Sequence, residues 1–172
     1  MASLRLLRAT MLAALLAPLA LPGASAAPED EHRRGLEAYH RGDVAAAMTI
    51  LRAPARAGHA PSQSLLAFML DRGDFVDEAA QLYAQAAAQD DTEALYALAN
   101  FHLTGRGVAK DEKRAVALFS KAADLGHVPS MQVLADAYAK GTMGLAPDAA
   151  QSAHWRARVA ELRPSVPAKG AR

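Results

Sequence analysis

Apolar residues recur along most of the chain every three or four positions, which is the period of an amphipathic α-helix. Segments such as "ALYALANFHL" and "SMQVLADAYA" carry this pattern. It differs from the strict alternation of a half-buried strand. Several segments run into a glycine, namely Gly42, Gly73, Gly105 and Gly141. The pattern therefore predicts an all-α chain whose helices are separated by glycine-containing turns.

The helical segments also repeat. A shift of 36 residues places Leu98 on Leu134 and Gly105 on Gly141, and weaker copies lie further upstream. A fixed period of about 20–50 residues is typical of stacked-repeat folds. Three positions before each turn glycine stands a large side chain: Tyr39, Leu70, His102 or Tyr138.

A second helical pattern follows each turn glycine. In all four copies it places a large residue at one matched position, and in three of them an alanine one turn earlier. Small residues let neighbouring helices approach closely, and large ones fill the gaps between layers. The pattern therefore predicts about four helix-turn-helix pairs over residues 27–162. The matched large residues are Leu51, Tyr83, Phe119 and Trp155.

The third copy, "EALYALANFHLTGRGVAKDEKRAVALFSKAADLGH" from Glu93 to His127, resembles the Sel-one-like repeats of the tetratricopeptide superfamily. The second copy has a shorter turn, the fourth an inserted residue, and the first carries Pro54 in its second helix. The resemblance implies a right-handed α–α superhelix with a concave face that holds other macromolecules. Because several members of this family are catalytically silent scaffolds, it also implies a protein that is not an enzyme.

The stretch "LTGRGVAKDEKRA" is predicted to be a turn between helices and not a phosphate-binding loop. Its glycines, Gly105 and Gly107, are two residues apart, and no Ser or Thr follows Lys110. A phosphate loop needs Gly-x-x-x-x-Gly-Lys-Ser/Thr after a strand. Glycine can adopt the left-handed backbone conformation that ends a helix. Asp111 stands where a side chain caps the next helix.

Two "RGD" strings, at residues 41–43 and 72–74, are predicted to serve the same purpose. In each, glycine would end one helix and the aspartate would cap the next. His59 and His127 follow the glycines in "AGHA" and "LGHV". We expect their rings to bond the last carbonyl groups of the preceding helices.

Candidate chemistry is sparse. The chain has no cysteine, which excludes disulfides, a thiolate nucleophile and a Cys-ligated metal. Its six histidines show no spacing typical of a metal site. No Gly-x-Ser-x-Gly motif is present, and the paired carboxylates at 90–91 and 111–112 stand at expected helix starts. No cofactor, metal or catalytic residue is predicted.

Residues 1–26 are interpreted as a signal peptide. Arg5 and Arg8 precede an apolar run, and Ala24 and Ala26 supply small residues before a cut at Ala27. The apolar run is shorter than the roughly 20 residues of a membrane span, which disfavours an uncleaved anchor. The protein is therefore predicted to be periplasmic or secreted, with no stable membrane anchor after cleavage.

Removal of the signal leaves 17 basic and 18 acidic residues, a net charge of −1 with His neutral. That balance gives no reason to expect binding to nucleic acid. Residues 163–172, "RPSVPAKGAR", are predicted to be a flexible tail.

The resemblance places the first helix of each pair on the concave side. Five residues before each turn glycine stand Glu37, Phe68, Asn100 and Asp136. With the neighbouring residues Gln63, Tyr96 and Gln132, they are predicted to form a groove for a protein or peptide, with Phe68 and Tyr96 as anchors. The alternative is that these are ordinary solvated residues.

The sequence thus favours a non-catalytic periplasmic scaffold or adaptor. Two alternatives stay open: an envelope enzyme or enzyme accessory acting on cell-wall material, and a structural spacer in a secretion or polysaccharide-export assembly.

The signal-peptide interpretation predicts that the exported protein begins at Ala27. Amino-terminal sequencing and the intact mass of protein from the periplasmic fraction measure this directly. Recovery of the 172-residue chain in the membrane fraction would contradict cleavage and support an anchor.

Overall fold

The computed structural model describes residues 27–162, which form eight α-helices and, within that range, no strand. The predicted signal peptide and tail lie outside the described residues. The all-α arrangement of four helix pairs is confirmed. The helices are α1 (Pro28–His40), α2 (Val44–Arg56), α3 (Ala60–Arg72), α4 (Val76–Ala87), α5 (Thr92–Thr104), α6 (Glu112–Asp124), α7 (Val128–Lys140) and α8 (Ala149–Leu162).

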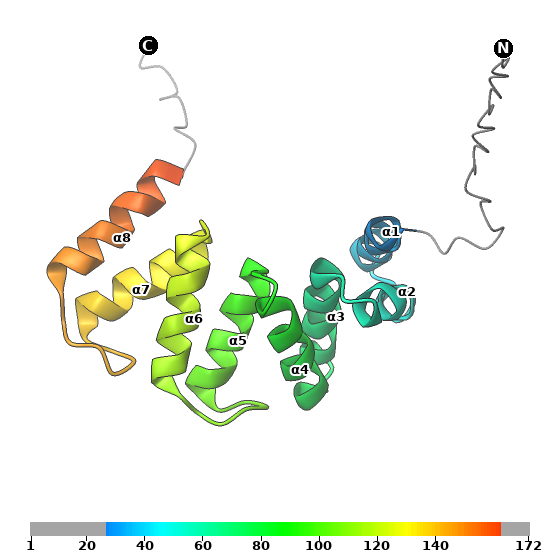
Figure 1. The fold of residues 1–172 in the computed structure, drawn as a ribbon, viewed down its shortest axis with the longest axis horizontal. Coiled ribbons are helices and arrows are strands. Elements are labelled where there is room, and N and C mark those ends of the chain that lie inside the picture. Colours follow the sequence, from blue (N-terminus) through cyan, green and yellow to red (C-terminus); the bar gives the residue numbers. More distant parts are fainter. Residues whose placement is uncertain (1–26, 163–172) are drawn as a thin grey trace, which may run out of the picture.

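The helices stack in sequence order as pairs α1–α2, α3–α4, α5–α6 and α7–α8. The second helix of each pair also packs on the first helix of the next. Figure 1 shows the resulting arc, with α1 and α8 at its two ends. Helix α1 also contacts α3 directly, so the first helices of the first two pairs meet.

The core follows the repeat pattern. Ala67, Ala99 and Ala135 are buried at matched places in the first helices, where a larger side chain would hold the helices apart. The matched large residues of the second helices are also buried: Leu51, Tyr83, Phe119 and Trp155. The predicted division between small contact positions and large filling positions is therefore confirmed.

The turn after α5 forms as predicted. Gly105 ends the helix with φ +76°, and the Asp111 carboxylate accepts a hydrogen bond from the Arg114 N–H at 2.9 Å. The Asp111 N–H donates to the His102 carbonyl. In the fourth pair the Asp148 N–H donates to the Tyr138 carbonyl in the same way, so the inserted residue is absorbed in the loop.

The prediction for the two "RGD" turns is right for the first and wrong for the second. Asp43 caps α2 by accepting from the Ala46 N–H at 3.0 Å. Asp74 instead adopts φ +62°, and α4 begins after Phe75 without a side-chain cap. The Asp74 carboxylate bonds the Arg106 guanidinium at 3.3 Å. Both turns have three residues, 41–43 and 73–75, and the middle one is left-handed in each. Because α3 continues through Arg72, that middle residue is Asp74 and not the glycine, and the residue before α4 is Phe75.

The prediction for His59 and His127 is also wrong. Their backbone N–H groups, and not their rings, donate to the Pro54 and Ala122 carbonyls of the preceding helices. Each ring contacts a serine in the first turn of the following helix at 2.8 Å. The left-handed glycine before each histidine reverses the chain direction. The histidine ring therefore lies against the first turn of the following helix and not against the end of the preceding one.

Gly107 tests how the turn between α5 and α6, the turn of the third pair, packs on the second pair. A Cβ at this position would lie 2.8 Å from Val76 Cγ1 and 3.0 Å from the Val76 carbonyl oxygen. We expect Gly107→Ala to cost about 1–3 kcal/mol from overcrowding, added to about 1–2 kcal/mol for a left-handed alanine. Urea unfolding monitored by circular dichroism measures the loss.

Gly42→Ala is the matched control. Gly42 is also left-handed, at φ +82°, but nothing lies within 4 Å of an added Cβ. It should show only the backbone cost. Equal destabilisation by the two variants would contradict a role for the Gly107–Val76 contact.

Candidate functional site

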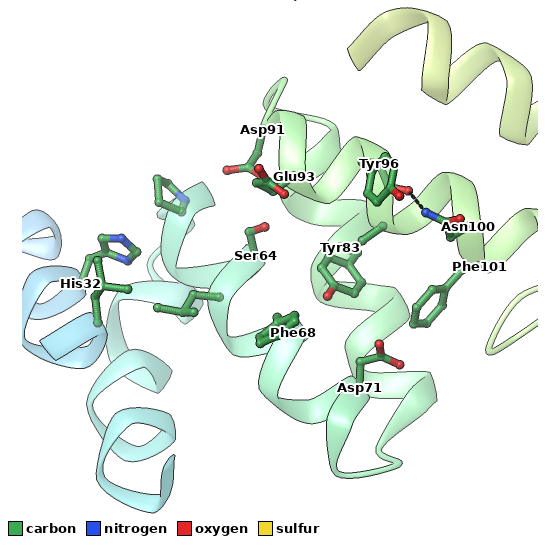
Figure 2. A pocket seen from close by; sticks show the side chains of 14 residues that line it. His32, Ser64, Phe68, Asp71, Tyr83, Asp91, Glu93, Tyr96, Asn100 and Phe101 are labelled. Atoms are coloured by element: carbon green, nitrogen blue, oxygen red, sulfur yellow. Dashed lines mark hydrogen bonds between the residues drawn. The ribbon is translucent and has the colours of Figure 1, made fainter. Parts of the chain in front are cut away.

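A groove of about 520 Å³ lies between α1, α3, α4 and α5 (Figure 2). Side chains from three successive pairs line it. Its apolar lining consists of Leu36, Pro61, Leu65, Phe68, Tyr83, Tyr96, Ala97 and Phe101, and its polar lining of His32, Ser64, Asp71, Asp91, Glu93 and Asn100.

The floor of the groove is aromatic. Tyr83 and Phe101 meet edge to face with ring centroids 5.5 Å apart. Tyr96 packs in the same way on the buried Phe119 at 5.6 Å. Phe68, which is 37% exposed, contacts Tyr39 of α1 edge to face. Phe68 and Tyr96 remain partly exposed to the groove, whereas Tyr83 and Phe101 are buried at its edge.

Tyr83 brings a hydroxyl group to this floor. Burial raises the pKa of Tyr83, and the nearby carboxylates of Asp71 and Glu93 raise it further. The hydroxyl therefore remains protonated, and it makes no hydrogen bond within the described residues. It is available as a donor to a bound group.

Asp71 lies at the foot of the groove and is held by Arg106, a residue of the third turn. The Arg106 guanidinium pairs with the Asp71 carboxylate and donates to the Asp71 carbonyl at 3.1 Å. This contact links the turn after α5 to the end of α3. Sequence reasoning missed this contact, because the two residues are 35 positions apart and Arg106 stands between two turn glycines.

Asp91 and Glu93 form the acidic end of the groove, at the start of α5 (Figure 2). Asp91 caps the helix by accepting from the Ala94 N–H at 2.8 Å. Glu93 is mostly exposed and lies 3.4 Å from Nε2 of His127. Carboxylates at a helix start are stabilised by the free N–H groups of the first turn.

Three of the seven predicted groove residues line this groove: Phe68, Tyr96 and Asn100. The Asn100 amide donates to the Tyr96 carbonyl at 2.9 Å, so the amide nitrogen is engaged and the oxygen is the group left to accept a hydrogen bond. Glu37 is exposed on α1 but does not contribute to the lining. Phe68 and Asn100, at matched positions of successive repeats, therefore share one cavity.

The other predicted residues lie elsewhere. Gln63 is buried, and its amide donates to the Ala55 carbonyl and to Gln85 while accepting from Gln89. Gln132 and Asp136 line a separate hollow of about 350 Å³ between α7 and α8.

Ser64 was missed. It lines the groove four residues before Phe68, just as Tyr96 stands four residues before Asn100. Residues four apart share a helix face, whereas Gln63 is five before Phe68 and turns toward the neighbouring helices. Strict use of the four-residue spacing would have found Ser64.

Ser130, His127 and Glu93 stand in the order of a nucleophile, a base and an acid. The Ser130 Oγ lies 2.8 Å from Nδ1 of His127, whose other nitrogen faces Glu93. Ser130 is fully buried, however, and its N–H also bonds the histidine ring. The arrangement is a helix cap, and no substrate can reach the hydroxyl in this conformation.

Residues 27–162 contain no group of three or more His, Asp or Glu side chains arranged to hold a metal ion. Within the same range, no helix combines the length and the apolar character that crossing a membrane requires.

His32 joins the first pair to the second beside the groove. Its Nδ1 lies 3.3 Å from the Ser62 Oγ, and its ring meets that of His59 at 5.3 Å. Burial lowers the pKa of His32, and His59 lowers it further, while Asp91 acts in the opposite direction.

The lowered pKa predicts that acidification destabilises the fold. Above the ordinary value of 6.5, His32 is neutral in both states and has no effect. As the pH falls below 6.5, the unfolded chain takes up a proton that the folded chain resists, so the free energy of unfolding decreases. Urea unfolding between pH 7.5 and about 5 should show a flatter dependence for His32→Gln than for the natural protein. Identical slopes would contradict this assignment.

The helix pairs of this chain match a known repeat family. A family model of the Sel1 repeat matches three consecutive segments, residues 60–91, 92–127 and 128–162. They coincide with pairs α3–α4, α5–α6 and α7–α8, and the first pair lies outside the match. Sel1 repeat proteins generally mediate protein–protein interaction, and the family is typically non-catalytic.

Two solved structures share the fold. A Sel1 repeat protein from Oxalobacter formigenes superposes with a TM-score of 0.72 at 26% identity, covering 80% of this chain and 59% of that one. The protective antigen c5321, present in uropathogenic Escherichia coli strains and displaying an SLR fold, superposes with a TM-score of 0.70 at 26% identity. That match covers 78% of this chain and 30% of the antigen.

A curated relative, the uncharacterized protein NMB1327 of Neisseria meningitidis serogroup B, is 32% identical over 139 residues. The match covers 78% of this chain and 29% of the relative, so the chain spans less than a third of that relative's length. Because the repeat matches cover more than half of the sequence, the chain belongs to the Sel1 repeat family.

Proposed function

We propose that this protein is a non-catalytic periplasmic adaptor that binds a segment of a partner protein in the groove between α1, α3, α4 and α5. The general role of Sel1 repeats in protein–protein interaction supports the class of function. The signal-like residues 1–26 and the absence of cysteine support the periplasm or the outside of the cell as its place.

One observation carries the groove as the binding site. Phe68 and Asn100, at matched positions of successive repeats, open into a single cavity whose floor is aromatic. Partly exposed aromatic surface gains free energy when a partner covers it. A volume of about 520 Å³ holds a few side chains of an extended segment, and aromatic anchors in a pocket are typical of interface hot spots.

Polar groups placed around this floor can orient such a segment. The Tyr83 hydroxyl can donate a hydrogen bond, and the Asn100 amide oxygen can accept one. Pockets that combine an apolar lining with a few fixed polar groups bind with both affinity and orientation.

The alternatives are an envelope enzyme or enzyme accessory acting on cell-wall material, and a structural spacer. The histidine–serine contacts give no support to an enzyme, because Ser62 and Ser130 are both fully buried. A spacer would not need two partly exposed rings, Phe68 and Tyr96, in one groove. Turnover of wall fragments by the purified protein would favour the enzyme.

The adaptor function predicts that Phe68→Ala/Asn100→Ala loses its partner. Crosslinking in the native cells, followed by mass spectrometry, identifies the captured protein. The affinity of the purified pair is then measured by calorimetry. Truncating an anchor of this kind costs about 1–2 kcal/mol or more, so we expect a loss of roughly tenfold or greater.

Phe75→Ala is the matched control. Phe75 is 60% exposed but lies outside the groove, so it should retain the partner. Circular dichroism verifies that both variants are folded. Equal binding by the groove variant and the natural protein would move the interface to another surface, and capture of no partner would contradict the adaptor function.

A further inference from the structure

The charge of the groove indicates the chemistry of its partner. Three of its lining residues are acidic, namely Asp71, Asp91 and Glu93, and no lysine or arginine contributes to the lining. Asp71 is already paired with Arg106. The remaining two carboxylates lie together at one end of the groove, near Ser64 (Figure 2).

Asp91 has no cationic partner among the described residues. No Lys, Arg or His nitrogen within residues 27–162 lies within the ion-pair distance of 4.0 Å from its carboxylate. One of its oxygens accepts from the Ala94 N–H, and the other is available. Glu93 uses one oxygen toward His127, which also leaves one free. This end of the groove therefore offers two carboxylate oxygens to a bound cation.

Three basic groups near the groove, those of His32, Lys121 and Arg72, do not neutralise the Asp91 and Glu93 carboxylates. Burial beside His59 lowers the pKa of His32, so that ring is neutral at pH 7. Lys121 pairs with Asp90, outside the lining. Arg72 lies over the Phe68 ring with its guanidinium carbon 5.8 Å from the ring centre, at the other end of α3 from Ser64.

The aromatic floor complements a cationic side chain in a second way. The stem of an arginine or lysine is apolar and packs along hydrophobic surface while its head reaches a charge. Aromatic faces attract cations directly, by about 0.5–2 kcal/mol. Tyr96 stands one helical turn beyond the Asp91–Glu93 pair on α5, so one side chain can touch both. An acidic segment would instead meet two carboxylates.

We propose that the groove recognises a partner segment with an arginine or lysine next to an apolar residue. The cationic head binds between Asp91 and Glu93, and the apolar neighbour packs on the exposed ring of Phe68. This inference rests on the proposed adaptor function and specifies its partner.

An array of immobilised, end-capped hexapeptides tests the preference. Each position is fixed in turn as Arg, Lys, Glu, Leu or Phe, and the purified protein is applied at low and at high salt. We expect the strongest binding where Arg or Lys adjoins Leu or Phe, with a marked loss at high salt because the pairing is electrostatic. The best peptide is then titrated in solution, alongside the same peptide with citrulline in place of arginine.

The double variant Asp91→Asn/Glu93→Gln removes the charges with little change of shape. Asparagine caps helices as well as aspartate does, so α5 should form normally. We expect this variant to bind the arginine peptide at least tenfold more weakly and the citrulline peptide unchanged. Asp43→Asn is the matched control, because Asp43 caps α2 through the same contact outside the groove. It should leave both affinities unchanged.

The possible failures are distinguishable. Peptide binding without a preference for Arg or Lys, or equal affinities of the double variant and the natural protein for the arginine peptide, would overturn the cationic partner and leave the adaptor function standing. Absence of any peptide binding, together with partner capture that Phe68→Ala/Asn100→Ala does not weaken, would overturn both.

Discussion

The structure depends on the close contact between successive helix pairs, because no pair can bury its apolar face alone. Alanines at matched positions of the first helices, such as Ala67 and Ala99, are fully buried and let the backbones approach. The second helices supply the volume that fills the layers, for example Phe119, which has no exposed surface. Burial of a side chain of this size contributes about 1.5–3 kcal/mol. The stability of the domain is therefore distributed over its interfaces, as in other repeat proteins.

The turns reinforce this stacking as well as reversing the chain. Gly107 lies against Val76 of the preceding pair, and Arg106 reaches the Asp71 carboxylate and carbonyl. One turn thus holds two pairs in register. On the opposite side of the repeat, His127 is used as a cap and also packs on Tyr96 with ring centroids 5.1 Å apart. Residues that the sequence marks only as turn residues therefore also make contacts between helix pairs.

The groove is a consequence of this register. Curvature brings α1, α3 and α5 to one inner surface, where Phe68 and Tyr96 cannot be buried completely because no further helix covers them. The contacts beneath, between Tyr83 and Phe101 and between Tyr96 and Phe119, hold the floor rigid. A preformed surface loses little conformational entropy on binding, which favours affinity. The carboxylates at the start of α5 serve both the helix and the rim, so the local requirement for a cap also gives the groove its charge.

The sequence by itself determined the helices, their pairing, most of their turns and the core positions. Each of these depends on interactions within a few residues or on a period that repeats, such as the cap at Asp111 or the alanines at matched places. It also placed Phe68, Tyr96 and Asn100 on the groove, because Tyr96 and Asn100 are four residues apart on one face of α5 and Phe68 holds the position of α3 that matches Asn100.

Only the tertiary structure decided the rest. Gln63 is buried and bonds the amides of residues more than 20 positions away, and Ser64 takes the place beside the groove. Asp136 faces α8 while its counterpart Asn100 faces the groove, because each first helix meets different neighbours along the arc. The partnership of Arg106 with Asp71 and the capping role of His127 likewise depend on how the chain is placed in space. The sequence shows which hydrogen bonds and contacts each of these side chains can make with its neighbours along the chain. The packing of separate helices determines which partner each side chain has.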